Sequence, residues 1–321
     1  LALEGSSYDL NINMFNHFQN TITGWPGGKP GADDSTRPER KSPNSKRVII
    51  FSPHPDDDVV SMGGTFDRLV SQGHEVHIAY QVKGNIAVSD HDALKFIEVS
   101  KDMFKNDSKV LVSELIKELK NNKPDKIDSQ AVRDLKGFIR KREAIAATRY
   151  IGIPDSNTHF MNLPFYDTGR IKKNPPTTKD VLITASLIKK IKPHQIFAAG
   201  DLEDPHGTHK VCLDITLDAL NTLKGEKFIK DCWLWLYRGA WLDWDVHDID
   251  MAVPMSPAQV LRKRKAIFFH QTQKDGVMFQ GQDLREFWVR AEERNSETAE
   301  KYKKMGLADY AAIESFKRHY Y

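Results

Sequence analysis

Two short segments hold most of the side chains that could carry out chemistry in this chain. Residues 52–58 (SPHPDDD) place one imidazole and three carboxylates within five positions, and prolines on both sides of His54 restrict the backbone there. Residues 204–209 (DPHGTH) carry two histidines three positions apart. Imidazole and carboxylate together form a ligand set typical of zinc or another divalent transition metal. The two segments therefore predict a metal site, provided that the fold brings them together.

The chemistry expected of such a site is amide hydrolysis. His54, one aspartate and one histidine of the second segment would supply three ligands and leave a fourth position open for water. A second aspartate could accept the proton of that water, and the remaining histidine could stabilise an oxyanion or protonate a leaving amine. Two other interpretations of 52–58 stay open: a surface turn whose aspartates cap the next helix, and an acidic Mg²⁺ site for phosphate chemistry. His54 argues against Mg²⁺, because imidazole suits transition metals better.

Both segments follow apolar, β-branched runs that predict buried strands. Strands are expected at 48–52, 74–82, 158–163, 195–200 and 232–237, and helices at 60–72, 91–104, 110–121, 129–150, 178–191, 206–223, 256–270 and 283–304. This alternation predicts an α/β fold with a Rossmann-like, mostly parallel sheet covered by helices on both faces. Ligands bind at the carboxyl ends of the strands in such sheets, so both segments should lie at one edge.

Composition excludes several classes of protein. With 40% apolar residues the 321-residue chain can bury a sizeable core, which excludes a fully disordered protein. The 47 basic and 44 acidic residues balance to +3, which argues against nucleic acid as the main partner. No apolar run approaches the roughly 18 residues of a membrane span. Cys212 and Cys232 are the only cysteines, so we expect no disulfide framework and a cytoplasmic location.

The motifs are those of a known family. PHPDDD at 53–58, MGGT at 62–65 and HGTH at 206–209 resemble the PIG-L/LmbE-like family of zinc-dependent N-deacetylases. The resemblance extends over about residues 46–300 and includes REAIAATRYIGIP at 142–154 and FFHQTQ at 268–273. It implies a hydrolase that removes the N-acetyl group from an N-acetylglucosamine-type amino-sugar derivative and releases acetate.

The resemblance also implies a role for each residue of the two segments. The family's zinc ligands map onto His54, Asp57 and His209, and its catalytic base maps onto Asp56. The histidine that assists the oxyanion or the leaving group maps onto His206. The family motif usually ends in Glu where this chain has an aspartate at position 58, but that position is neither ligand nor base. The metal expected is Zn²⁺, with Fe²⁺ or another divalent ion as the alternative.

Four further residues are candidate substrate contacts. Asn85 follows the second predicted strand, where the family often has Glu. Trp241 follows the strand at 232–237 and offers an aromatic ring for a sugar. Arg238, just past the same strand, could meet a phosphate or carboxylate, although a surface ion pair is the usual role of such a residue. His270 lies in the HQTQ segment and is either a site residue or a buried structural histidine.

The first 46 residues are expected to lie outside the deacetylase domain. Residues 24–46 are dense in Gly, Pro, Ser and charge, which predicts a linker or extended arm over the surface, and residues 1–23 should form at most a short helix packed on the α/β body. The chain is similar to the C-terminal LmbE-like module of bacterial fusions whose N-terminal module resembles glucosamine-6-phosphate deaminase. We therefore predict an N-terminal extension at 1–46, the tail of an upstream module, and a deacetylase domain at 47–321. A non-catalytic carbohydrate-binding or regulatory module of such a fusion stays open as the second hypothesis, and a homo-oligomer is a further expectation.

Overall fold

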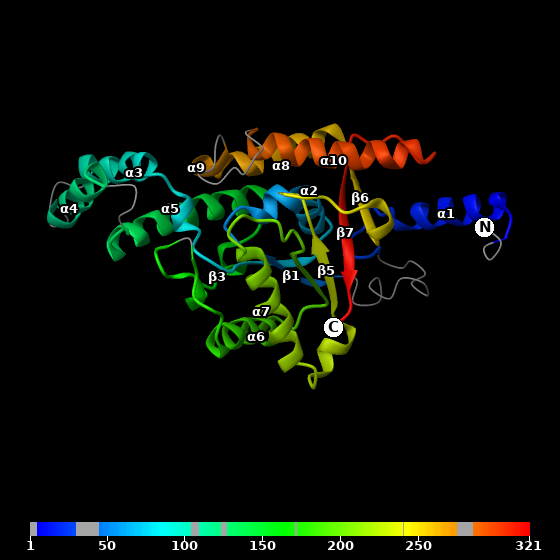
Figure 1. Cartoon of the computed structure of the whole chain (residues 1–321), viewed down its shortest axis with the longest axis horizontal. Coiled ribbons are helices and arrows are strands. Elements are labelled where there is room, and N and C mark those ends of the chain that lie inside the picture. The colour runs from blue at the N-terminus through cyan, green and yellow to red at the C-terminus, as the bar shows by residue number, and fades with distance from the viewer. Residues whose placement is uncertain are drawn as a thin grey trace.

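A seven-stranded sheet forms the centre of the molecule (Figure 1). The computed structural model describes residues 5–29, 45–103, 109–122, 127–170, 172–239, 241–274 and 285–321. The strands are β1 (Arg47–Ser52), β2 (Glu75–Tyr80), β3 (Thr158–Phe160), β4 (Gln195–Ala199), β5 (Trp233–Tyr237), β6 (Met251–Met255) and β7 (Ala312–His319), in the order β3-β2-β1-β4-β5-β7-β6. The first five strands are parallel to one another, and β7 runs antiparallel to β5 and β6.

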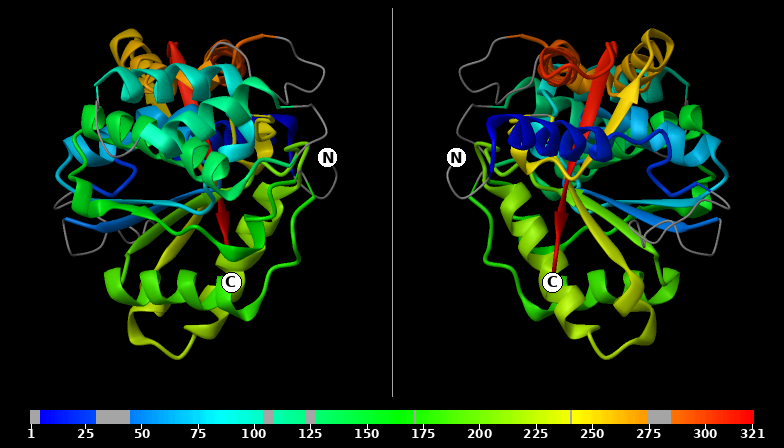
Figure 2. Two further views of the ribbon diagram at one scale, coloured as in Figure 1. Left: turned by 90° about the vertical axis from the view of Figure 1, so that its left-hand side faces the viewer. Right: turned by 90° about the vertical axis from the view of Figure 1, so that its right-hand side faces the viewer.

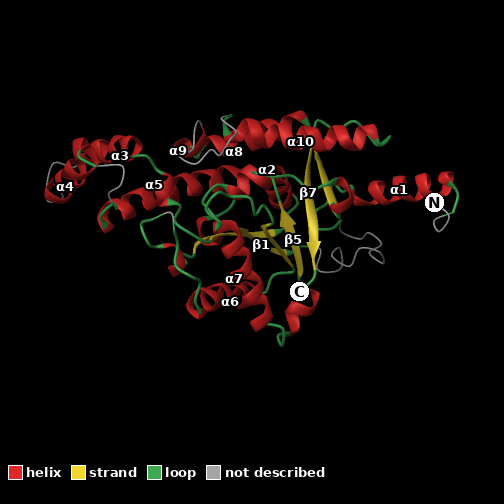
Figure 3. Cartoon of the chain, in the orientation of Figure 1, coloured by secondary structure: helices red, strands yellow, loops and turns green. Residues whose placement is uncertain are grey.

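Helices cover both faces of this sheet (Figures 2 and 3). They are α1 (Ser7–Thr21), α2 (Asp57–Ser71), α3 (Asp90–Met103), α4 (Lys109–Lys120), α5 (Gln130–Ile151), α6 (Thr178–Ile191), α7 (Thr208–Thr222), α8 (Pro257–Phe268), α9 (Gln271–Lys274) and α10 (Phe287–Lys304). In β1, Val48 and Ile50 contribute to the core on one face, while Ile49 and Phe51 contribute to the core on the other. A strand buried on both faces explains the continuous apolar run. The prediction of a Rossmann-like, mostly parallel sheet is confirmed.

The antiparallel strands β6 and β7 were not predicted. Their sequences, MAVPM and AIESFKRH, carry a proline and five charged or polar residues and lack the apolar run of the central strands. Glu314 in β7 is nevertheless buried, because its carboxylate accepts hydrogen bonds from the backbone N–H groups of Gly64 (2.9 Å) and Thr65 (2.6 Å). Nζ of Lys263 in α8 lies 2.8 Å from Oε1 of Glu314 and forms an ion pair with this carboxylate. These long-range partners make a charged residue compatible with the core.

The MGGT segment has a structural role in joining α2 to this part of the sheet. A Cβ atom on Gly64 would lie 2.1 Å from the Met255 sulfur, and one on Gly63 would lie 3.0 Å from Cγ of Lys263. The two glycines therefore permit close packing of α2 against α8 and the β6–β7 pair. Since α2 begins at the first candidate segment, this packing also anchors the candidate site.

The described N-terminal residues pack on the α/β body. Helix α1 buries Phe18 and joins α10 through a 2.8 Å hydrogen bond between the hydroxyl groups of Thr21 and Tyr302. It is longer than the short helix expected, with 15 residues. Residues 26–28 are buried rather than on the surface, and Gln195 donates a hydrogen bond to the Pro26 carbonyl; the rest of the predicted linker, 30–44, lies outside the described residues. None of the described helices is long and apolar enough to cross a membrane.

Candidate active site

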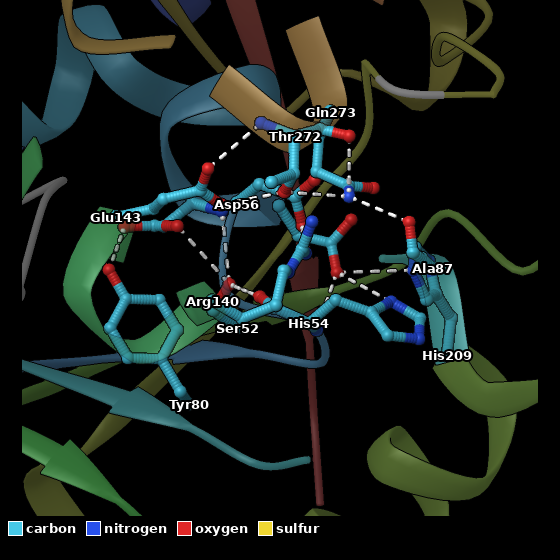
Figure 4. Close-up of polar contacts among 12 residues, drawn as sticks. Ser52, His54, Asp56, Tyr80, Ala87, Arg140, Glu143, His209, Thr272 and Gln273 are labelled. Carbon is cyan, nitrogen blue, oxygen red and sulfur yellow. Dashed lines mark hydrogen bonds and ion pairs between the residues drawn. The ribbon is translucent and has the colours of Figure 1, made fainter. Parts of the chain in front are cut away.

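The two candidate segments meet at the carboxyl edge of the sheet. Strands β1 and β4 are paired in parallel, so the loop that leads into α2 and the loop that leads into α7 leave the sheet side by side. One cavity opens between them (Figure 4). The residues that line it come from both loops, from α5, from the short helical turns at 85–87 and 164–166, and from α9 and the start of α10.

Three of the predicted ligands converge at this cavity. One potential ligand atom from each of His54, Asp57 and His209 lies within 4.8 Å of the other two. Oδ2 of Asp57 is 3.2 Å from Nδ1 of His54 and 3.2 Å from Nε2 of His209. Asp57 opens α2 and His209 lies in the first turn of α7. Two helices and one proline-flanked loop thus hold the three side chains.

The surroundings of His209 fit a metal ligand. Its Nδ1 lies 2.7 Å from the Asp201 carbonyl oxygen, which requires the proton on Nδ1 and leaves the lone pair on Nε2 when the ring is neutral. Nε2 is buried and lies 3.2 Å from Oδ2 of Asp57, with which it forms an ion pair when the ring is protonated. Burial disfavours the charged imidazole, but Asp57 overrides this and raises the pKa of His209 to about 10. A site that stabilises positive charge this strongly suits a divalent cation, and two imidazoles with a carboxylate suit zinc or a similar transition metal.

Asp56 lies next to this triad and is held by a buried arginine. Its Oδ1 accepts a 2.8 Å hydrogen bond from Nη2 of Arg140, whose side chain is only 1% exposed. Burial raises the pKa of Asp56 above its usual 3.8, and Arg140 is the strongest influence that lowers it. Asp56 lines the cavity together with Arg140. A carboxylate with this setting can accept a proton from a group bound in the cavity.

Asp58 supports the first loop rather than lining the cavity. Its side chain is fully buried and accepts hydrogen bonds from the hydroxyl groups of Tyr80 (3.0 Å) and Ser52 (3.3 Å). Burial raises the pKa of Asp58 to about 7. The Ser52 hydroxyl also bonds the His54 carbonyl at 2.5 Å, so this network holds the loop that carries His54.

The second loop places His206 on the cavity wall. His206 is half-buried and precedes α7, one turn before His209. Asp204 fixes this turn because its carboxylate accepts hydrogen bonds from the backbone N–H groups of Thr208 (2.7 Å) and His209 (3.2 Å). Gly207 adopts the left-handed conformation at φ 64°, which a glycine adopts without strain. The motif DPHGTH is therefore a helix start that presents two histidines to one cavity.

The four candidate substrate contacts differ in whether they line the cavity. Trp241 lines the cavity and packs edge-on against Phe287. Asn85 is buried in the turn whose next two residues line the cavity. Arg238 does not line it: its guanidinium stacks 3.7 Å from the centre of the Trp244 ring and donates a hydrogen bond to the Gly200 carbonyl. His270 is fully buried behind the cavity wall, where burial and the charge of Arg140 lower its pKa to about 3.

Sequence reasoning missed several residues that line the cavity. Outside the two predicted segments, those with polar or charged side chains are Arg140, Tyr166, Lys173 and Gln273. Arg140 lies on the apolar face of α5, so its position in the helical pattern was a usable signal for a buried cation. Gln273 reaches the cavity because Glu143 of α5 accepts two 2.8 Å hydrogen bonds from Thr272, which tie α9 to α5 (Figure 4). No local signal marks Tyr166 or Lys173, which lie in a short helical turn and in the loop after it.

The fold and this site together define a class of Rossmann-like proteins with a candidate metal centre at the carboxyl edge of the sheet. The family model of PIG-L, GlcNAc-PI de-N-acetylase, matches residues 49–220. The chain belongs to the PIG-L family, and this membership supports a deacetylase-type hydrolase. A Bacteroides thetaiotaomicron protein with the provisional name glucosamine-6-phosphate deaminase-like protein is 52% identical over an alignment of 325 positions, which covers 98% of this chain and 49% of that relative. The chain thus spans about half the length of this curated relative.

Solved structures share the fold at low sequence identity. N,N'-diacetylchitobiose deacetylase from Pyrococcus horikoshii is 18% identical with a TM-score of 0.54, covering 86% of this chain and 84% of the other. GalB, the 4-carboxy-2-hydroxymuconate hydratase from Pseudomonas putida KT2440, is 14% identical with a TM-score of 0.55, covering 86% and 97%. One fold thus carries a deacetylase and a hydratase, so the reaction of this chain must be argued from its own site.

Proposed function

We propose that this chain is a metal-dependent hydrolase that removes the N-acetyl group from an N-acetylglucosamine-type amino-sugar derivative and releases acetate. The observation that carries the proposal is one cavity lined by His54, Asp57 and His209 beside the Arg140-held carboxylate of Asp56. Membership of the PIG-L family supports the same reaction.

The metal would be held by His54, Asp57 and His209, and zinc is the ion that this donor set favours. When bound, such an ion would supply Lewis-acid chemistry, polarising the amide carbonyl and lowering the pKa of water. Asp56 would take the proton of the attacking water. Arg140 engages Oδ1 of Asp56 and leaves Oδ2 for that proton. The ion pair therefore orients the base as well as favouring its ionised form.

His206 would act on the other side of the reaction. As water adds to the amide carbon, negative charge develops on the carbonyl oxygen, and a hydrogen-bond donor at that oxygen lowers the barrier. When the C–N bond breaks, the amine nitrogen must gain a proton, and the carboxylate product leaves as acetate. His206 lines the same cavity as Asp56 and approaches it from the opposite loop. This placement suits a donor to the oxyanion or to the leaving amine.

The walls of the cavity suit a sugar. Tyr166, Trp241 and Phe287 contribute aromatic surface, on which the apolar face of a pyranose ring can stack. The backbone at 86–87 and the Gln273 side chain add polar groups at the rim. An amino-sugar ring would thus be held by aromatic contacts while its amide reaches the three ligands.

The relative that is twice as long supports a further part of the proposal. We infer that the chain works beside a second module in a longer protein, and the relative's name makes a deaminase-like module the first candidate. Both cysteines are free and buried in the structure, which agrees with the proposed cytoplasmic location.

Metal analysis and a substrate screen on one sample test the function. Protein purified without added metal should carry about one transition-metal ion per chain, and Asp57→Asn and His209→Ala should lose it, because each removes one of three ligands. The same sample should release acetate from N-acetylated amino sugars. Bound metal without turnover of any acetylated sugar would favour the non-catalytic module. Phosphate release with a requirement for Mg²⁺ would favour the phosphohydrolase.

A further inference from the structure

We propose that Lys173 is a specificity-determining residue that binds an anionic group, a phosphate or a carboxylate, on the amino-sugar substrate. This inference rests on the proposed function and specifies its substrate class. Lys173 belongs to the loop between the turn at 164–166 and α6, and it lines the same cavity as the three candidate metal ligands.

The position of Lys173 is set by an aromatic ring. Its Nζ lies 3.9 Å from the centre of the Tyr166 ring, and it donates a 2.7 Å hydrogen bond to the Arg170 carbonyl. The ring of His54 lies edge-on to the same Tyr166, with 6.2 Å between the ring centres. The ammonium group and a candidate metal ligand therefore both pack against one aromatic ring of the cavity wall. A sugar whose amide reaches the ligands can then carry a charged substituent toward Lys173.

The carboxylates that line the cavity are not available to Lys173 as counter-ions. Each carboxylate on the cavity wall is already committed: Asp56 to Arg140, Asp57 to the two histidines, and Asp204 to the first turn of α7. Among the described residues no carboxylate forms an ion pair with Lys173. Burial lowers its pKa to about 8, with no opposing influence from a neighbouring acid.

A lysine with a purely structural role would differ from this one. Buried structural lysines normally have a paired carboxylate, as Lys136 has in Asp90 and Asp128 at 2.6 and 2.7 Å. Lys173 instead places a desolvated ammonium beside an open cavity, which is costly unless an anion enters. An ammonium is a compact charge with three donors, and phosphate and carboxylate oxygens are the acceptors that suit it.

A comparison of charged and neutral substrates tests the proposal. We would measure kcat/KM for N-acetylglucosamine, its 1-phosphate, its 6-phosphate and N-acetylmuramic acid with the wild type, Lys173→Met and Lys172→Met. Lys172 is the exposed neighbour of Lys173 and serves as the matched control. The wild type and Lys172→Met should prefer one anionic substrate by about 10–100-fold, the range of a charge-assisted hydrogen bond. Lys173→Met should lose that preference and retain its rate on the neutral sugar.

Two results would overturn the proposal: no preference in the wild type, or an equal loss on charged and neutral substrates in Lys173→Met. The phosphate and carboxylate substrates also show which anion is bound. Calorimetry of glucosamine and glucosamine 6-phosphate binding to the zinc-loaded chain separates this inference from the proposed function. If no substrate turns over, the function fails, but binding of glucosamine 6-phosphate that is lost in Lys173→Met supports the anion site. Binding that does not depend on Lys173 refutes it.

Discussion

The ion pair between Arg140 and Asp56 leads to a prediction about pH dependence. As a base, Asp56 must be ionised, and its activity is lost as the pH falls through its pKa. Burial raises that pKa, and Arg140 is the strongest influence that lowers it. Arg140→Met retains the length of the side chain and removes both the charge and the 2.8 Å hydrogen bond. The pKa of Asp56 should therefore rise in the variant.

The size of the effect follows from the contact. A hydrogen bond to a charged group contributes about 1.5–3 kcal/mol, and one pKa unit corresponds to about 1.4 kcal/mol. The acid limb of the kcat/KM profile should thus move to higher pH by about one to two units. At a pH below the acid limb of the wild type, the variant should be about 10–100-fold slower than the wild type. At high pH the difference should narrow, because Asp56 is then ionised in both proteins.

The assay is acetate release between about pH 5 and 9, using protein of verified metal content. Arg142→Met is the control, because Arg142 is an exposed arginine on the same helix. Asp56→Asn defines the rate without the base. A bound cation would favour the ionised carboxylate in both proteins, so the shift between them remains. An Arg140→Met variant with normal metal content and an acid limb that coincides with the wild type would refute the argument that Arg140 controls the ionisation of Asp56.

Three other predictions follow from the same structure. Asp56→Asn should reduce turnover by about 10²–10⁴-fold and leave metal content near normal, because Asp56 is outside the ligand triad. Loss of metal in this variant would instead make Asp56 the metal ligand and Asp57 the base. His206→Ala should lower kcat more than it raises KM, because its hydrogen bond strengthens in the transition state; an unchanged kcat with a raised KM would make it a ground-state binding residue. Lys263→Met should lower the free energy of unfolding by about 3–5 kcal/mol, because it leaves the fully buried carboxylate of Glu314 without its cation. Chemical denaturation measures this, and Lys263→Met/Glu314→Gln should recover part of the loss; a single variant as stable as the wild type would contradict it.

Local patterns in the sequence were enough to predict the central strands and the two loops of the site. The run 48–52 is apolar on both faces, because helices cover both faces of a central parallel strand. A continuous apolar run of this kind can be recognised in the sequence without knowledge of any long-range contact. The same holds for the segments around His54 and His206: their charge density and their place after buried strands indicate a site before any contact is known.

Only the tertiary structure decided what surrounds those loops. Arg140 reaches Asp56 across 84 positions of sequence, and Lys173 reaches the cavity from an irregular loop whose path no periodicity encodes. The burial of Glu314 depends on Lys263 and on the backbone of α2. The polar sequence of β7 therefore does not indicate by itself that the strand is buried. The physical reason is common to Arg140 and Glu314: a charged side chain is stable in the interior only beside specific partners, and those partners are distant in sequence.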